Sequence, residues 1–226
     1  MLSYLKAVIF APIYFIIDFM DYVQAVIKYY PNKNFRHADL RLLKSYLFHN
    51  PYAICKRYLQ DFPNDQVQKV YGETYFSTLT EIAERAGLSE KDTFFDLGCG
   101  RGRSIFWFNT VIGGRAVGVE INPLFIHKAR KIQNKMNLTG IEFKLANLME
   151  VDYSDATCVY IYGSVFTEEA IYHIIEALKK LKPGTFVISV TYPLTDYTDE
   201  NLFFLEQEFT ARFLWGYTGI YIQRKL

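Results

Sequence analysis

The chain has 226 residues, of which 50% are hydrophobic and 22% are charged, so it can build one sizeable core with an appendage and is neither disordered nor fibrous. Lys and Arg number 25 against 24 Asp and Glu, which excludes the basic excess that drives general nucleic-acid binding. The three cysteines are widely spaced and form no CxxC pair, so neither a disulfide framework nor a structural zinc site is expected. We therefore predict no bound metal, no nucleic-acid partner and a reducing, cytoplasmic location.

The first element in the chain is an apolar helix, expected over residues 4–29. Its polar residues, Asp18, Asp21 and Gln24 among them, lie on one narrow stripe, and the rest of its surface is apolar. A membrane span is disfavoured, because each aspartate costs about 2.5–3.5 kcal/mol at the centre of a bilayer. Three coverings of the apolar face stay open: the chain's own domain, which we expect, a membrane interface, or a second copy of the chain. If a membrane covers it, the basic residues that follow place the remaining chain on the cytoplasmic side.

The next residues complete a helical N-terminal extension that is predicted over residues 1–69. Two further helices are expected there, at about Ala38–Phe48 and Tyr52–Leu59, between turns rich in Pro and Asn. A second domain is predicted over residues 70–226.

In this second domain helical stretches alternate with short β-rich runs. The helices are predicted at 74–87, 102–112, 123–137 and 167–181, and the strands at Thr93–Leu97, Arg115–Glu120, Ile141–Leu145, Thr157–Tyr162 and Thr185–Tyr192. This alternation predicts an α/β fold whose parallel sheet is buried on both faces. After a short helix near 199–205, the closely spaced strands Glu206–Phe213 and Gly219–Arg224 predict an antiparallel hairpin.

A strand that ends in an acidic residue runs into three alternating glycines, in Asp96-Leu97-Gly98-Cys99-Gly100-Arg101-Gly102. Glycines there permit positive φ and let a ligand lie against bare backbone. A dinucleotide fingerprint would need a further glycine where Arg103 stands, and the GK[ST] of a P-loop is missing. The acid at the strand tip instead suits a ligand with its own positive charge, and Glu120, at the tip of the next strand, is placed to accept the hydroxyls of a ribose.

These motifs resemble those of the class I S-adenosylmethionine-dependent methyltransferases, whose first motif reads much like DLGCGRG and whose second strand ends much like GVE. The resemblance implies a Rossmann-like, seven-stranded, mostly parallel sheet and S-adenosyl-L-methionine as the cofactor. It implies that the three glycines back the methionine end, that Asp96 orders the amino group and that Glu120 holds the ribose. It also places these residues beside the cofactor: Cys99, Ile121, Asn147, Leu148 and Tyr160. For Asn147 an ordinary turn role stays open, and for Tyr160 a core role.

Upstream of the first strand, Tyr71-Gly72-Glu73-Thr74 is similar to a YGE segment of the non-SET histone-lysine methyltransferases, where it closes over the methionine end of the cofactor. The residues alone also allow a plain helix cap at Thr74. That family places asparagines near the positions of Tyr162 and Gly163, and they are missing here. The turn Lys180–Gly184 and the aromatic run Trp215–Ile222 resemble the membrane-anchored lysine methyltransferases that modify an ATP synthase subunit, together with their bacterial relatives.

The tip of the fourth predicted strand carries the candidate catalytic residues, Tyr162 and Gly163. A phenol and a backbone carbonyl there are expected to orient a lysine amine and to help remove its proton. The chain has no (N/D)PPY tetrapeptide and no Pro-Cys nucleophile, which disfavours methylation of nucleic-acid bases. We predict N-methylation of a protein lysine. A small-molecule or lipid methyltransferase and a non-catalytic cofactor-binding scaffold stay open as alternatives.

Overall fold

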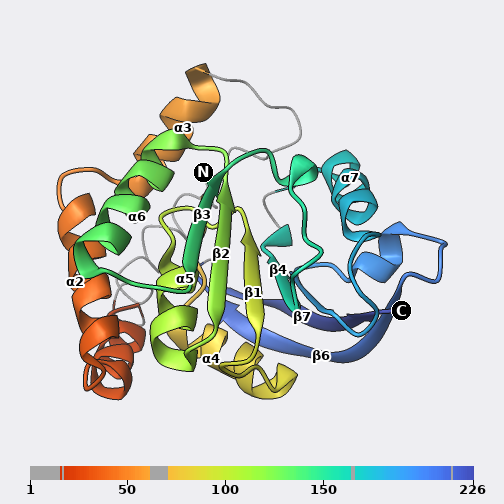
Figure 1. Ribbon diagram of the computed structural model, residues 1–226, viewed down its shortest axis with the longest axis horizontal. Helices are drawn as coiled ribbons and strands as arrows, with labels where there is room; N and C mark the ends of the chain where they lie inside the picture. Colours follow the sequence, from red (N-terminus) through yellow and green to blue (C-terminus); the bar gives the residue numbers. More distant parts are fainter. Residues whose placement is uncertain (1–15, 17, 62–70, 164–165, 215) are drawn as a thin grey trace, which may run out of the picture.

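The computed structural model describes residues 16, 18–61, 71–163, 166–214 and 216–226. A seven-stranded sheet in the order β3-β2-β1-β4-β5-β7-β6 runs through the molecule (Figure 1). Its strands are β1 (Thr93–Leu97), β2 (Arg115–Glu120), β3 (Ile141–Leu145), β4 (Cys158–Ile161), β5 (Phe186–Val190), β6 (Phe203–Phe213) and β7 (Gly216–Lys225). Neighbours among β1 to β5 are parallel, whereas β7 is antiparallel to both β5 and β6. The predicted mostly parallel sheet with a C-terminal hairpin is confirmed.

Helices cover both faces of the sheet, as the nearly continuous apolar character of the central strands requires. The helices are α2 (Lys33–Tyr46), α3 (Pro51–Asp61), α4 (Phe76–Ala86), α5 (Arg103–Trp107), α6 (Pro123–Met136) and α7 (Glu168–Leu178). Successive side chains of β1 point to opposite faces, so Phe94 joins the core under α2, α4, α5 and α6, and Phe95 joins the core under α7. The helix predicted over 102–112 is divided, because α5 continues as a π-helix over Phe108–Ile112.

Two local predictions are corrected by the structure. The helix expected near 199–205 does not form, because Phe203 and Phe204 already pair with β7 and a short 3-10 turn at Leu194–Tyr197 precedes them. Pairing with a distant strand here outweighs local propensity. The helix expected from residue 74 begins at Phe76, and Thr74 instead forms an isolated β-bridge with Phe213.

In the N-terminal extension, residues 18–29 are helical, and residues 4–15 and 17 of the predicted helix lie outside the described residues. Ala25 and Tyr29 are buried in the same core cluster as Phe76 of α4. The polar stripe also faces the domain, since Asp18 accepts a hydrogen bond from the Tyr75 hydroxyl and Asp21 accepts one from Ser77. The extension is thus packed against the helices that cover one face of the sheet.

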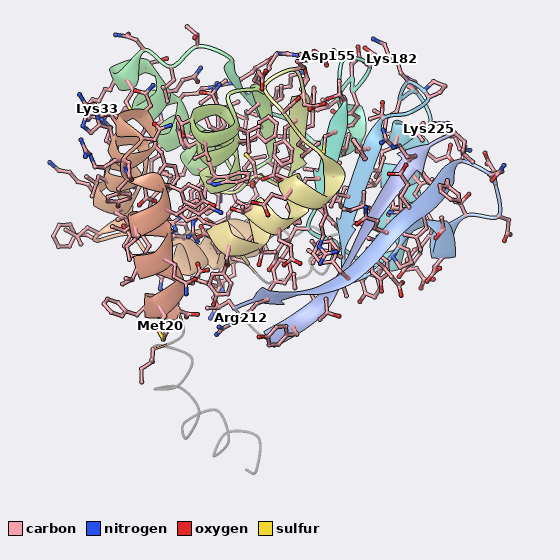
Figure 2. The ribbon with its side chains drawn as sticks, turned by 90° about the horizontal axis from the view of Figure 1, so that it is seen from below. Met20, Lys33, Asp155, Lys182, Arg212 and Lys225 are labelled. Carbon is pink, nitrogen blue, oxygen red and sulfur yellow. The ribbon has the colours of Figure 1, made fainter. Side chains whose placement is uncertain are left out.

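The apolar face of this helix points the other way. Phe19, Met20 and Ile27 are 59%, 55% and 72% exposed, and Ile16 and Val23 extend the same stripe. Figure 2 shows the helix at the edge of the molecule, with Met20 at its outer end. We expected the domain to cover this face, but within the described residues its apolar side chains stay exposed.

Candidate functional site

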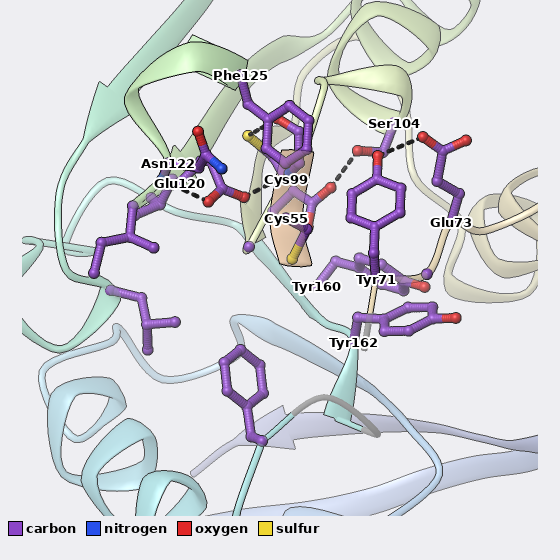
Figure 3. Close-up of a pocket in the computed structure, with 18 of the residues that line it drawn as sticks. Cys55, Tyr71, Glu73, Cys99, Ser104, Glu120, Asn122, Phe125, Tyr160 and Tyr162 are labelled. Atoms are coloured by element: carbon purple, nitrogen blue, oxygen red, sulfur yellow. Dashed lines mark hydrogen bonds between the residues drawn. The ribbon is translucent and has the colours of Figure 1, made fainter. Parts of the chain in front are cut away.

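A cavity of about 420 Å³ opens at the carboxyl ends of β1, β2 and β4. This is where open α/β sheets bind ligands, because β1 lies between β2 and β4 and the crossovers leave it in opposite directions. Fourteen of the residues singled out from the sequence line it: Tyr71, Gly72, Glu73, Thr74, Asp96, Gly98, Cys99, Gly100, Glu120, Ile121, Asn147, Leu148, Tyr160 and Tyr162. Figure 3 shows Glu120 on one side of the cavity and Tyr71, Tyr160 and Tyr162 on the other.

The glycine loop forms the floor between β1 and α5. Gly98, Gly100 and Gly102 have φ values of 87°, 53° and 84°, in the left-handed region that side chains rarely adopt. Gly102 is not among the residues that line the cavity. A Cβ atom at Gly102 would lie 2.7 Å from the Phe143 ring, so this glycine lets the loop pack closely on β3.

Two carboxyl groups enter the cavity from the strand tips. Asp96 is 5% exposed and accepts a hydrogen bond from the Ser104 hydroxyl, and its burial raises its pKa to about 7. Glu120 accepts hydrogen bonds from the N–H groups of Gly100, at 2.9 Å, and Asn122, at 2.8 Å. Burial raises the pKa of Glu120 although these backbone bonds oppose the shift. Both oxygens of Glu120 are therefore held in place and keep lone pairs for a ligand.

The segment Tyr71–Thr74 closes one side of the cavity and is fastened to the glycine loop. Glu73 accepts hydrogen bonds from Arg101 through both carboxylate oxygens, the Nη2–Oε2 distance being 2.7 Å, and it accepts one from the Tyr71 hydroxyl at 2.6 Å. Burial alone would raise the pKa of Glu73, but the Arg101 guanidinium outweighs it and the pKa is lowered. The Tyr71 ring lies over Gly100, where a Cβ atom would be 3.0 Å from it.

The fourth strand supplies two tyrosines to the same wall. The Tyr160 hydroxyl lies 2.6 Å from the Thr74 hydroxyl, which ties β4 to the closing segment. The Tyr162 ring packs so closely on Gly72 that a Cβ atom there would lie 2.4 Å from the phenol oxygen. Gly163 lies outside the cavity lining; a Cβ atom there would be 2.4 Å from the Val190 carbonyl oxygen, and its own carbonyl accepts a hydrogen bond from the Phe166 N–H.

Several lining residues were missed from the sequence. Cys55, Tyr58 and Leu59 come from α3, in the extension, and no motif in that helix points toward a ligand. Asn122 and Phe125 come from the start of α6, where an Asn-Pro pair is a recognisable helix start. The remaining lining residues that were missed are Arg103, Ser104, Val119, Ala146, Met149 and Ala170. Phe166, which also lines the cavity, is one of the aromatic residues that the sequence suggests for an apolar pocket.

Known proteins are similar to this chain in sequence and in fold. Residues 96–201 match a family model described as the ANTKMT methyltransferase domain. The chain is 33% identical over 141 residues to a protein-lysine N-methyltransferase of Saccharolobus islandicus. That alignment covers 60% of this chain and 84% of the relative. It is 30% identical over 138 residues to the H3 lysine-79 specific histone-lysine N-methyltransferase of Dictyostelium discoideum. This second alignment covers 54% of this chain but only 8% of the relative.

Among solved structures, an RNA methyltransferase from Salinibacter ruber in complex with S-adenosyl-L-homocysteine superposes with a TM-score of 0.56 at 28% identity. The match covers 68% of this chain and 93% of that chain. The names of these proteins agree on methyl transfer and differ in the group that receives the methyl.

Proposed function

Because the chain belongs to the class I S-adenosylmethionine-dependent methyltransferases, we propose that it methylates the side-chain amine of a protein lysine. The observation that carries the proposal is that the glycine loop and the closing segment Tyr71–Thr74 line the same cavity. The glycine loop, Asp96 and Glu120 suit the cofactor. The closing segment and Tyr162 suit the end of the cavity where a lysine amine would accept the methyl group. The similarity to protein-lysine N-methyltransferases supports this acceptor over a small molecule or a lipid.

The residues present fit S-adenosylmethionine. At Gly98 no Cβ atom obstructs a ligand, whereas the bare face of Gly100 accommodates the Tyr71 ring. Glu120 presents lone pairs to ribose hydroxyls, and buried Asp96 offers a negative charge to an ammonium group. When bound, the cofactor supplies an electrophilic methyl group. The chain then has to hold a neutral amine in line with that methyl and keep water away.

The acceptor end is formed by aromatic side chains at the tip of β4. Tyr160, Tyr162 and Phe166 line the cavity there. An apolar, aromatic wall favours the neutral form of a lysine amine, because desolvation lowers its pKa. The phenol of Tyr162 can accept a hydrogen bond from the amine and direct its lone pair toward the methyl.

The acceptor is tested by incubating the purified protein with methyl-labelled S-adenosylmethionine and cell fractions. The label is expected in protein bands, and hydrolysis of those bands is expected to yield methyl-lysine. Label that travels with extracted lipids or small metabolites would contradict the lysine proposal. Cofactor binding without any transfer would instead favour the scaffold alternative.

Cofactor binding is expected to weaken as the pH falls below about 7. Asp96 holds a proton in the empty cavity below its pKa of about 7, and a cationic ligand favours the ionised carboxylate. Binding must then release that proton, so the affinity falls by at most about tenfold per pH unit below pH 7 and levels off above it. Calorimetry at pH 6 to 8 in buffers of different ionisation enthalpy measures both the affinity and the proton release. Asp96→Asn is the control and should flatten the profile, whereas a flat profile in the unmodified protein would contradict the expectation.

We also propose that the exposed stripe formed by Ile16, Phe19, Met20, Val23 and Ile27 rests on a membrane interface, with the domain on the cytoplasmic side. The polar stripe of the helix is engaged by Tyr75 and Ser77, so its outward face is apolar and suits the boundary of the acyl chains. Basic side chains of α2, including Lys33, Arg41 and Lys44, are exposed and would favour anionic headgroups. Among the described helices, none combines the length and apolar character needed to cross a bilayer.

Flotation with anionic liposomes tests this contact. We expect the full chain to float and the variant Phe19→Ser/Val23→Ser/Ile27→Ser to stay in the dense fraction with an unchanged melting temperature, since these side chains make up exposed surface. A deletion of residues 1–28 is less informative, because it also removes buried Ala25. Tyr217→Ser is the matched control, as Tyr217 is a well-exposed apolar residue of β7, and it should float. Equal flotation of the triple variant, or no flotation of the full chain, would overturn the proposal.

A further inference from the structure

Arg103 is the residue that directly follows the glycine loop, at the start of α5. Its side chain is 16% exposed, and its guanidinium lies 3.9 Å from the centre of the Phe76 ring. Among the described residues that line the cavity, it is the one basic side chain. The ligand that occupies this cavity therefore meets a single fixed positive charge.

Most N–H donors of the Arg103 guanidinium make no hydrogen bond to the described residues. Its Nη1 donates to Glu73 Oε2 at 3.5 Å, and no other hydrogen bond joins the guanidinium to the described residues. Because a guanidinium has five N–H donors, about four of them lack a partner among the described residues. Arg101, by contrast, already grips both oxygens of Glu73. Arg101 thus neutralises the charge of Glu73, and the guanidinium of Arg103 can pair with a second anion.

The neighbouring residue completes a site for a zwitterion. The Ser104 hydroxyl donates a hydrogen bond to Asp96. Arg103 and Ser104 are consecutive residues of α5, so the cationic Arg103 and the acidic partner of Ser104 both border the cavity. The amino-acid end of S-adenosylmethionine carries one ammonium group and one carboxylate. Asp96 suits the ammonium group, and the planar fork of an arginine matches a carboxylate with two parallel hydrogen bonds.

We propose that Arg103 binds the carboxylate of the amino-acid end of the cofactor, an inference that rests on the proposed function. Arg103 then acts as a binding residue that selects ligands with an intact amino-acid end. Arg101 has a different role in the same loop, because it positions Glu73 and with it the closing segment Tyr71–Thr74.

Calorimetry with two ligands separates these roles. S-adenosylhomocysteine has the full amino-acid end, whereas 5′-methylthioadenosine keeps the adenosine and sulfur but has no carboxylate. Arg103→Met is expected to weaken S-adenosylhomocysteine binding by about 10- to 150-fold, the range for hydrogen bonds to charged groups, and to change methylthioadenosine binding by less than about threefold. Arg103→Lys should recover part of the loss. Arg101→Met is the matched control and should weaken both ligands by similar factors.

The inference fails if Arg103→Met weakens both ligands equally, because Arg103 would then only hold the closing segment, as Arg101 does. Unchanged S-adenosylhomocysteine binding would overturn it as well. Thermal unfolding of each variant shows that it is folded, and if Arg103→Met is not, the comparison of the two ligands is made with Arg103→Lys. A failure of the proposed function looks different, because the unmodified protein would then bind neither ligand.

Discussion

Glu120→Ala is expected to weaken S-adenosylmethionine binding by about 1.5–3 kcal/mol, which is roughly 10- to 150-fold. The carboxylate is expected to accept the ribose hydroxyls, and it also fixes the backbone on both sides of the site by accepting the N–H groups of Gly100 and Asn122. The variant therefore loses a charged hydrogen-bond acceptor and the anchor of the glycine loop. Asp96→Ala should cause a loss of similar size through the amino group of the cofactor.

Calorimetry with circular dichroism measures the affinity and checks the fold together. Glu142→Ala is the matched control, because Glu142 is an exposed carboxylate on β3 that pairs with Arg115 at 3.0 Å, and it should bind the cofactor normally. Glu73→Ala should weaken binding less than either variant, since Glu73 closes the site and does not form its floor. Affinity like that of the unmodified protein in both Glu120→Ala and Asp96→Ala would refute the assignment of these acids to the cofactor.

The predicted site residues that the structure brings together lie on short stretches of chain. The glycine loop and Asp96 are contiguous, and Glu120 follows after one helix, so parallel pairing of β1 with β2 brings the two acids to the same edge of the sheet. The position of the cavity follows from this local order and from the rule that ligands bind at the carboxyl ends of parallel strands.

What the sequence does not predict depends on contacts between distant segments. The start of β6 was predicted as a helix because its strand character comes from pairing with β7. Cys55 and Leu59 reach the cavity only because α3 lies over it, and a helix in an extension gives no sign of that position. Arg103 was used only to exclude a dinucleotide fingerprint. Its proposed role depends on the positive charge of Arg103 that stays in excess once Arg101 binds Glu73, and only the packed structure reveals this pairing.

Tyr162→Phe is expected to lower the turnover number by about 100-fold, the lower end of the range for a positioned proton acceptor, while cofactor affinity stays within about twofold. The substitution keeps the ring, which packs on Gly72 and lies 5.7 Å from the Phe213 ring centre, so the closing segment should stay in place. What is lost is the phenol oxygen, the atom that we expect to orient the acceptor amine. The loss should therefore fall on the rate of transfer and leave binding almost unchanged.

Tyr160→Phe is the control that separates transfer from closure. It removes the hydroxyl that lies 2.6 Å from the Thr74 hydroxyl and so is expected to loosen the segment Tyr71–Thr74, which we expect to cover the cofactor. We expect it to raise the Michaelis constant for the cofactor with a much smaller change in turnover, the reverse of the pattern for Tyr162→Phe. Single-turnover measurements at saturating cofactor read the transfer step alone. Turnover in Tyr162→Phe equal to that of the unmodified protein would remove this phenol from the transfer step and leave Tyr162 as a packing partner of Gly72, because its ring contacts are the same in both proteins.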